Sequence, residues 1–413
     1  RACLGKKDEM KNLYCDVVIA GCGVAGLFTA LHLPEDKKIL MLSKGDFESC
    51  DSMLAQGGIC MLRNEADYEP FYEDTMKAGH YENRAESVDL MIRKSQRVID
   101  QLVSYGVEFN RNVNGSLAFT REGAHSAPRI CYHKDITGKE ITTKLLAQVR
   151  DLSNVTLMEY TTMTDILSDR RSCKGMIAKT ASGEVLHIHA ADTVMATGGI
   201  GGLYAHSTNF PLLTGDACNI AKKHNVELEH MDYVQIHPTS LYSTRPGRSF
   251  LISESARGEG AILLNHRGER FIDELQPRDV VANGILAEME KEKVDHEWLS
   301  FENVSEQTID EHFPNIYQQC LKEGYDLKKE PIPIVPAQHY FMGGVHVDQN
   351  SQTTMEHLYA VGETSCNGVH GKNRLASNSL LESLVFAEQA ASSITSNEKG
   401  TEDYESNYHA ACC

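Results

Sequence analysis

The stretch that decides the fold reads DVVIAGCGVAG and spans residues 16–26. Its apolar residues 17–20 are short and β-branched enough for a buried parallel strand. Gly21, Gly23 and Gly26 follow in G-x-G-x-x-G spacing, and the apolar run after them predicts a helix that ends near Pro34. In a strand–turn–helix unit these glycines allow a tight turn, close backbone approach to a pyrophosphate and close helix packing. The stretch therefore predicts a bound dinucleotide.

The second predicted strand indicates which dinucleotide is bound. It covers residues 38–42, KILML, and is followed by Ser43 and Lys44, where an NAD-binding fold normally carries an acidic residue for the ribose hydroxyls. An NAD-dependent dehydrogenase is therefore disfavoured, and FAD is the better candidate. The charge-free run 17–33 is marginal in length for a membrane span, and the dinucleotide fingerprint explains it.

Composition limits the class of protein. A chain of 413 residues is long enough for two domains that share a large core, and a net charge of −18 argues against nucleic acid or an anionic membrane as a partner. The N-terminus has basic residues without an apolar core, so we expect a leader at residues 1–13, no signal peptide and a cytoplasmic protein. The twelve cysteines form no C-x-x-C pair, so we expect free buried thiols and no metal.

Periodicity predicts several further elements. Apolar residues at helical intervals predict a surface helix over 86–105, and further helices are expected at 138–150, from Asp216, and at 379–395. Alternating runs predict strands at 155–160, 173–180 and 184–189, with a hairpin turn at residues 182–183, and buried strands at 191–199 and 355–363.

Residues 231–339 are expected to form a second, inserted domain. Its segment 285–331 is richly charged and helix-prone, and the proline-rich stretch EPIPIVPAQHY follows at residues 330–340. We interpret that stretch as a stiff returning connection that positions His339. A proline-rich ligand for another domain is the alternative.

A glycine-rich loop carries the first family resemblance. Residues 51–59 read DSMLAQGGI, in which paired glycines let backbone amides meet a ligand, a simple surface turn being the alternative. The segment resembles the A-Q-G-G-I loop of the succinate dehydrogenase/fumarate reductase flavoprotein superfamily, where the loop lies against FAD. Members with covalent FAD carry a histidine five residues before the glutamine, and this chain has Asp51 there. The resemblance therefore implies noncovalent FAD.

A charged segment indicates one family within this superfamily. Residues 117–130 fit no regular element and are dense in Arg121, Glu122, His125 and Arg129, a composition typical of solvated loops. However, residues 120–126 read T-R-E-G-A-H-S and resemble a segment typical of L-aspartate oxidases. That family carries an acid at the position of Glu122, and fumarate reductases generally do not.

Polar residues in five other stretches suggest an anionic substrate. The stretches are VQIHPTS (234–240), LISESARGEG (251–260), PRD (277–279), PAQHYFMGG (336–344) and HGKNRLASNSLLES (370–383). Each residue alone has a structural explanation, such as pairing of Arg257 with Glu254 one helical turn away. Together they supply two cationic clusters, as a four-carbon dicarboxylate requires, because the arginine fork binds a carboxylate through two parallel hydrogen bonds.

The resemblance, which spans about residues 14–395, implies a role for each residue. Arg278 would be the essential acid/base, fed by Glu254 and Arg257. The implied substrate-binding residues are Glu122, Gln235, His237, Ser253, His339 and Arg374, with His237 and Ser253 on one carboxylate and His339 and Arg374 on the other. The implied FAD-binding residues are Gly21, Cys22, Gly23, Val24, Gly26, Ser43, Lys44, Asp51, Ser52, Met53, Leu54, Ala55, Gln56, Gly57, Gly58, Asp216, Glu363, Ser379 and Leu380.

The resemblance also implies a fold and a reaction. The fold is α/β, with a Rossmann-like FAD-binding domain of residues 14–230 and 340–413, an inserted α+β capping domain of 231–339, and no C-terminal helical domain of the usual kind. The reaction is oxidation of L-aspartate to iminoaspartate, with dioxygen (giving hydrogen peroxide) or fumarate as acceptor. It would open NAD biosynthesis through quinolinate, and a handover to quinolinate synthase stays open. The alternative is a soluble fumarate reductase or succinate-oxidising flavoprotein. A flavin-binding module without catalysis is disfavoured by the complete carboxylate-binding set.

Overall fold

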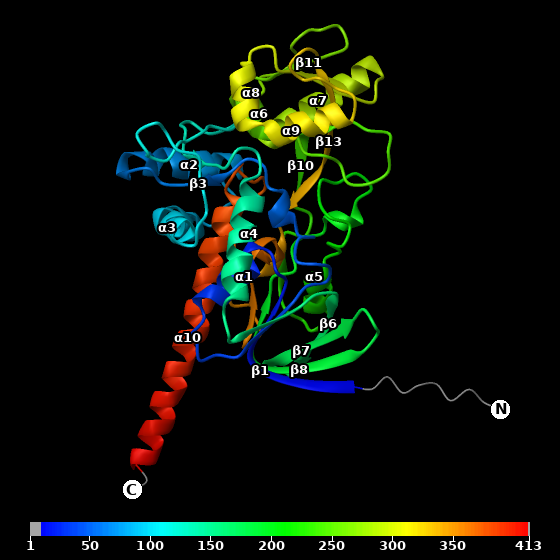
Figure 1. Ribbon diagram of the computed structural model, residues 1–413. Coiled ribbons are helices and arrows are strands. Elements are labelled where there is room, and N and C mark those ends of the chain that lie inside the picture. Colours follow the sequence, from blue (N-terminus) through cyan, green and yellow to red (C-terminus); the bar gives the residue numbers. More distant parts are fainter. Residues whose placement is uncertain (1–9, 412–413) are drawn as a thin grey trace, which may run out of the picture.

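The dinucleotide fingerprint lies at the centre of the largest sheet. The computed structural model describes residues 10–411, and Figure 1 shows this sheet in the lower half of the molecule. Its strand order is β5-β2-β1-β8-β7-β6, and β15 pairs with β8 as well. The strands are β1 (Met10–Ala20), β2 (Ile39–Leu42), β5 (Val155–Met158), β6 (Thr161–Ser168), β7 (Cys173–Thr180), β8 (Val185–Met195) and β15 (Leu358–Ala360).

The sheet is parallel where the fingerprint lies. β1 runs parallel to both β2 and β8, and β15 runs parallel to the end of β8, whereas β6, β7 and β8 form an antiparallel meander. Val17, Val18 and Ile19 of β1 are fully buried: Val17 and Ile19 belong to the apolar cluster of the helices on one face of the sheet, and Val18 belongs to a second cluster on the other face.

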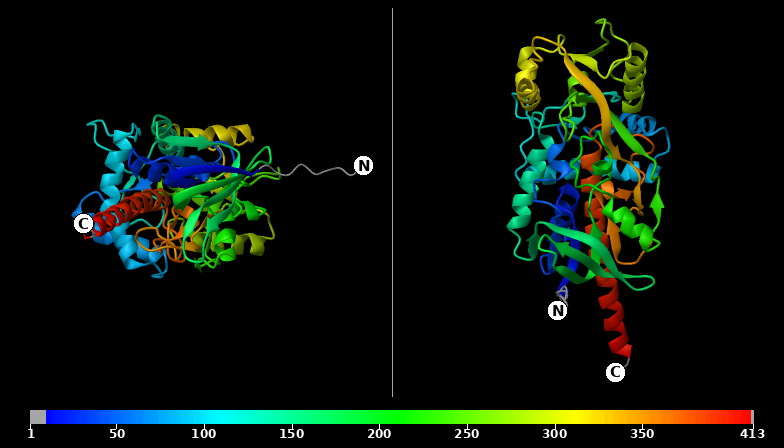
Figure 2. Two further views of the ribbon diagram at one scale, coloured as in Figure 1. Left: turned by 90° about the horizontal axis from the view of Figure 1, so that it is seen from below. Right: turned by 90° about the vertical axis from the view of Figure 1, so that its right-hand side faces the viewer.

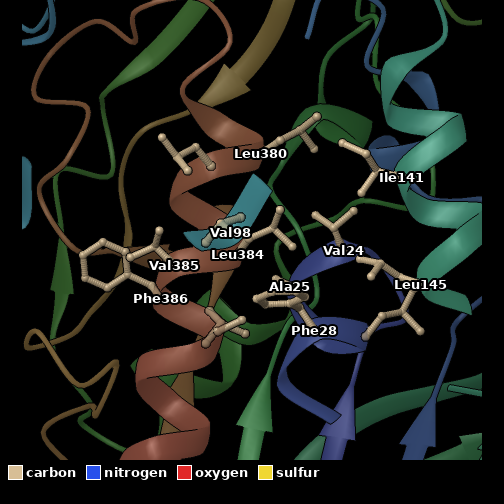
Figure 3. Close-up of a cluster of buried hydrophobic side chains, with 14 of the residues drawn as sticks. Val24, Ala25, Phe28, Val98, Ile141, Leu145, Leu380, Leu384, Val385 and Phe386 are labelled. Carbon is tan, nitrogen blue, oxygen red and sulfur yellow. The ribbon is translucent and has the colours of Figure 1, made fainter. Parts of the chain in front are cut away.

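Four helices pack on one face of this sheet. They are α1 (Val24–His32), α3 (Ala85–Ser104), α4 (Thr137–Arg150) and α10 (Ser379–Ala411). Their apolar residues form one buried cluster, in which Phe28 of α1 lies between Leu145 of α4 and Leu384 of α10 (Figure 3). The first and the last of these helices therefore share a core.

Smaller elements complete this part of the molecule. The helical ones are η1 (Asp51–Leu54), η2 (Glu65–Asp67), α2 (Tyr68–Ala78), η3 (Gly201–Leu203), α5 (Asp216–Lys223) and η4 (Gly362–Thr364). The strands are β3 (Ile59–Cys60), β4 (Ile130–Cys131), β9 (Leu228–Glu229), β14 (Gly344–His346) and β16 (Ser365–Cys366). A second apolar cluster, on the other face of the large sheet, includes residues of α5, β6, β7 and β14.

A second lobe stands at the top of Figure 1 around its own antiparallel sheet, whose strand order is β10-β13-β12-β11. Figure 2 shows β13 running from this lobe down into the rest of the molecule. The lobe has a core of its own. Its elements are β10 (Val234–Leu241), α6 (Glu254–Gly258), β11 (Ile262–Leu264), α7 (Arg278–Glu292), β12 (Glu297–Ser300), α8 (Glu306–His312), α9 (Pro314–Lys322) and β13 (Ile332–Phe341).

Several elements differ from the sequence-based expectations. The proline-rich stretch, expected as a stiff returning connection, is the sheet strand β13. Pro333 pairs opposite Trp298, and Pro336 lies within a register shift against β10, where its missing N–H leaves no ladder hydrogen bond unmade. The runs 184–189 and 191–199 merge into one strand, β8, which ends at Met195, and α10 continues beyond the predicted end at residue 395. Residues 1–9 of the expected leader lie outside the described residues, whereas residues 10–13 belong to β1.

Three further observations concern membranes, thiols and metals. Among the helices of residues 10–411, none is both long and apolar enough to cross a membrane. The cysteines within the described residues are free thiols. In the same part of the chain, no three His, Cys, Asp or Glu side chains are grouped so that they could hold a metal ion.

Candidate active site

A deep cleft connects the carboxyl ends of the parallel strands with the second lobe. Most of the predicted FAD-binding residues line it. Gly26 and Met53 do not, because Gly26 lies under the turn at Gly21 and Met53 contacts Thr143 on the outside of η1. At the far end, the cleft is lined by Glu122, His237, Ser253, Glu254, Arg278, His339 and Arg374.

The backbone at the start of α1 fits a pyrophosphate. Gly21 has a φ of +114°, and a Cβ there would lie 1.9 Å from the carbonyl oxygen of Ala196. A Cβ on Gly26 would lie 2.1 Å from the carbonyl oxygen of Gly21. The N-cap of α1 is Gly23, which has no side chain to cap the helix, and the N–H of Val24 donates to the Ser52 hydroxyl (3.1 Å). The N–H groups at the start of α1 and the helix dipole are suited to a phosphate anion.

Unpartnered polar atoms line the middle of the cleft. Asp51 accepts a hydrogen bond from the Phe210 N–H (2.9 Å), and its other oxygen has no partner among the described residues. Gln56 donates to the Leu251 carbonyl (2.7 Å), and its amide oxygen is likewise unpartnered within this part of the chain. Such orphaned polar atoms are expected where a polar ligand binds. Burial, reinforced by the nearby Asp51 charge, raises the pKa of Glu363 to about 8.

Lys44 and Asp216 meet at the end of β2. The Lys44 ammonium lies 2.8 Å from a carboxylate oxygen of Asp216 and donates to the Thr214 hydroxyl (2.8 Å). Asp216 begins α5, as the sequence predicted. The structure thus brings together two predicted FAD-binding residues that lie far apart in the sequence.

An arginine–carboxylate network lies at the far end of the cleft. Arg278, at the start of α7, donates through Nε to Glu254 Oε2 (2.5 Å) and through Nη1 to Gln235 Oε1 (3.0 Å). Glu254 Oε2 also lies 3.7 Å from Nη2 of Arg257, so Arg278 and Arg257 share one carboxylate oxygen. Both Arg257 and Gln235 lie behind the cleft wall, where they orient Arg278 and its partner Glu254.

Two buried histidines face each other near this network. The ring centroids of His237 and His339 are 4.9 Å apart. His237 Nδ1 accepts from the Thr239 N–H (3.1 Å), so its proton lies on Nε2, which has no partner among the described residues. Burial, followed by the charge of Arg278, holds the pKa of both imidazoles well below the usual range. Both rings are therefore neutral, and His237 offers a free N–H donor.

Arg374 is a buried cation without a counter-charge. Its Nη1 donates to Ser379 (3.0 Å), while its Nε has no hydrogen-bond partner among the described residues. No carboxylate in that part of the chain lies within ion-pair distance of the guanidinium, although Arg374 is only 4% exposed. Burial and the like charge of Arg278 lower the pKa of Arg374 to about 10. A bound anion would offset the free-energy cost of burying this unpaired charge.

Glu122 is a buried anion in the same space. It accepts hydrogen bonds from the hydroxyls of Ser255 (2.8 Å) and Ser377 (2.5 Å) and is only 1% exposed. The alternative of a solvated pairing with Arg121 or Arg129 is wrong, since these two arginines bond elsewhere. Burial, followed by the charge of Glu254, raises the pKa of Glu122.

The loop around Glu122 is fixed from three sides. The N–H of Ala124 donates to the Leu275 carbonyl of the second lobe (2.8 Å), and His125 contacts the Ala376 carbonyl (2.9 Å). Arg129 is completely buried and forms ion pairs with Asp67 and Asp74. The charged segment is therefore a rigid wall of the cleft and not a surface loop.

Ser253 and three further residues also line the cleft. Ser253 caps α6 by accepting from the Ser255 N–H (3.2 Å). The sequence analysis missed Thr208, which bonds His339 (2.7 Å), Ser377, which bonds Glu122, and Tyr340, which follows His339. Thr208 is a small hydroxyl residue outside the quoted stretches, and Ser377 lies within the stretch 370–383 but carries no local signal that separates it from the neighbouring serines.

Comparison with known proteins tests this interpretation. A family model described as an FAD binding domain matches residues 16–380. A curated L-aspartate oxidase from Clostridium perfringens is 49% identical over 382 residues, which is 92% of this chain and 87% of that protein. This chain belongs to the L-aspartate oxidase family. The L-aspartate oxidase of Clostridium acetobutylicum is 45% identical over 397 residues, covering 96% of this chain and 91% of the relative.

Solved structures place the L-aspartate oxidase family fold within the predicted superfamily. A quinol–fumarate reductase with menaquinol molecules superposes with a TM-score of 0.87 at 32% identity, over 94% of this chain and 72% of that one. The Sdh1 complex of Mycobacterium smegmatis with UQ1 matches with a TM-score of 0.79 at 27% identity, over 96% and 72% of the two chains. The predicted α/β FAD-binding fold is confirmed.

Proposed function

We propose that this chain oxidises L-aspartate to iminoaspartate with noncovalently bound FAD. The observation that carries the proposal is the position of Glu122. Its buried carboxylate lines the same cleft as Arg374 and Arg278 and is held only by two hydroxyls among the described residues. An anion beside two cationic groups suits a ligand that carries an ammonium as well as two carboxylates.

The residues of the cofactor half would hold FAD. Gly21, Gly23 and the start of α1 would meet the pyrophosphate, and Glu363, Gln56 and the 51–58 loop would meet the rest of the molecule. Bound FAD supplies the electron-accepting chemistry that no side chain here provides. The carboxylate side chain of Asp51, in place of the histidine of covalent superfamily members, supports noncovalent attachment.

The residues of the other half would fix the substrate. Arg374 with His339 would bind one carboxylate, and His237 with Ser253 the other, so that C2 of the substrate has one position. Neutral imidazoles suit this task because they donate hydrogen bonds without adding charge. Glu122 would bind the ammonium.

Arg278 would be the acid/base of the reaction. Glu254 and Gln235 fix its guanidinium, and Arg257 lies beyond Glu254, so protons would pass along Arg278, Glu254 and Arg257. In this proposal residues 231–339 act as a cap over the cleft, because Glu254, Arg278 and His339 all come from them. The imine would then enter quinolinate and NAD synthesis.

Turnover measurements test the substrate. The purified protein with FAD should consume dioxygen and release hydrogen peroxide with L-aspartate in air, and L-aspartate should bleach its flavin when dioxygen is absent. Added fumarate should restore the colour. Bleaching by succinate and not by L-aspartate would overturn the proposal in favour of a succinate-oxidising enzyme.

Acid precipitation tests the attachment. We expect yellow flavin in the supernatant after the protein is precipitated. Colour that stays with the pellet would contradict noncovalent binding.

A further inference from the structure

Tyr340 lies face-on to the guanidinium of Arg374. The Arg374 Cζ atom is 4.4 Å from the centroid of the Tyr340 ring, well within the range of a cation–π interaction. Tyr340 is itself buried, at 7% exposure, and lines the cleft beside His339. The contact therefore lies inside the site described above.

This contact differs from two other arginine–aromatic contacts in the described part of the chain. Arg93 lies equally close to the Tyr68 ring, but it is exposed and pairs with Asp89. Arg129 lies 5.1 Å from a phenylalanine ring, and two aspartates neutralise it. Within the described residues, Arg374 has no carboxylate at ion-pair distance and its guanidinium donates a hydrogen bond to a serine hydroxyl, so the ring face is a close partner of its charge.

The Tyr340 ring is fixed at both ends. Its backbone pairs with Gln235 across β13 and β10, and the side chain of Gln235 in turn donates to the backbone carbonyl of Arg374 (2.7 Å). Its hydroxyl lies 3.5 Å from Nε2 of His370, a buried ring whose edge faces Tyr340 at 85°. His370 Nε2 lies 3.9 Å from a carboxylate oxygen of Glu382 at the start of α10.

We propose that Tyr340 is a positioning residue for substrate binding: its ring face holds the Arg374 guanidinium plane so that the free N–H groups meet a substrate carboxylate. The inference rests on the proposed function for the role of Arg374 and deepens it. Without the ring, the guanidinium would be tied only through Ser379 and would lose the partner that offsets its desolvation. The reaction chemistry would not change, because Tyr340 does not lie between Arg278 and its proton partners.

A mutant cycle on the FAD-loaded protein tests the proposal. The variants are Tyr340→Leu, Tyr340→Phe, Arg374→Gln and the double variant of Tyr340→Leu with Arg374→Gln. For each variant, the KM and kcat for L-aspartate are measured, and the dissociation constant of succinate is read from the flavin absorbance. Tyr317→Leu is the matched control, because it removes an aromatic face 4.7 Å from the Lys328 ammonium in the second lobe, and neither residue lines the cleft.

We expect Tyr340→Leu to raise the KM for L-aspartate and the dissociation constant of succinate by about 10- to 100-fold, with kcat changed less than about threefold. Tyr340→Phe keeps the ring face and should recover most of the affinity, and Tyr317→Leu should change neither constant. In the Arg374→Gln background, Tyr340→Leu should weaken binding less than about threefold further, since the cation is already gone.

Two results would overturn the role of Tyr340. One is an equal loss on Tyr340→Leu in both backgrounds, and the other is a Tyr340→Phe variant as weak as Tyr340→Leu. A fall in thermal stability with unchanged succinate binding would also refute it, since the ring would then be purely structural. If the wild-type chain binds succinate but does not oxidise L-aspartate, the proposed function fails, and the succinate measurements still decide the role of Tyr340.

Discussion

Replacing Glu122 by glutamine removes one negative charge from the cleft and little else. Glutamine has the same length, and its amide oxygen can accept the hydroxyl hydrogen bond of Ser255 or Ser377 that the carboxylate accepts now. We therefore expect the Glu122→Gln variant to fold and to bind FAD. The variant should lose affinity only for ligands that carry a positive group bound by the carboxylate.

The burial of Glu122 sets the size of the expected rise in the KM for L-aspartate. Glu122 is almost fully buried, so an ammonium bound there is not screened by water. A charge-assisted hydrogen bond contributes about 1.5–3 kcal/mol, which corresponds to roughly a 10- to 100-fold rise in the KM for L-aspartate. Succinate has no ammonium and is a dianion, so its binding should be unchanged or tighter after the substitution.

The assay compares the two ligands on the same variants. The KM for L-aspartate is measured by peroxide release, and the dissociation constant of succinate by flavin absorbance. Glu259→Gln is the control, because Glu259 also accepts from a hydroxyl, that of Thr120 (2.9 Å), but does not line the cleft. Equal losses for L-aspartate and succinate, or no loss for either, would refute the ammonium-binding role of Glu122.

Three further predictions concern catalysis and stability. Arg278→Leu should lower kcat by about two to four orders of magnitude while FAD content stays unchanged, and turnover near the wild-type rate would remove Arg278 from the mechanism. Arg129→Met should lower the free energy of unfolding by about 3–5 kcal/mol in urea titrations, because it removes the buried charge partner of Asp67 and Asp74 and leaves Asp67 with only the partly exposed Arg63. Arg63→Met, which removes that more exposed partner, should cost less than about 1 kcal/mol. Burial, followed by the charge of Glu292, raises the pKa of Glu297 to about 7. The native state therefore keeps a proton that the unfolded chain releases near pH 4.5, and the stability that this proton contributes is lost as pH rises through about 7. Glu297→Gln should therefore lose less stability between about pH 5 and about pH 8 than the wild-type chain does, and parallel pH profiles would contradict this.

Local signals predicted the elements that depend on local chemistry. The glycine fingerprint placed β1 and α1, and helical periodicity placed α3 and α4, because each pattern is complete within one segment. β13 was misread because two prolines disfavour a strand. The register shift that accommodates Pro336 depends on β10, a partner that the local pattern does not include.

The site divides in the same way. Motif residues such as Arg278 and His339 could be found by resemblance, but the burial of Glu122 could not be read from a segment as charged as 117–130. Tyr340 was missed because side chains alternate along a strand, so its neighbour His339 would predict it on the opposite face. Both nevertheless line the cleft.

The shared core of α1 and α10 has a consequence for how the protein is made. The ribosome produces Phe28 long before Leu384, a residue of α10 that packs in the same cluster (Figure 3). Until then one apolar face of α1 lacks its cover and is a target for chaperones or for aggregation. Ser379 and Leu380, at the start of the same late helix, line the cofactor half of the cleft. The nascent chain can therefore complete its flavin site only after this helix has been synthesised.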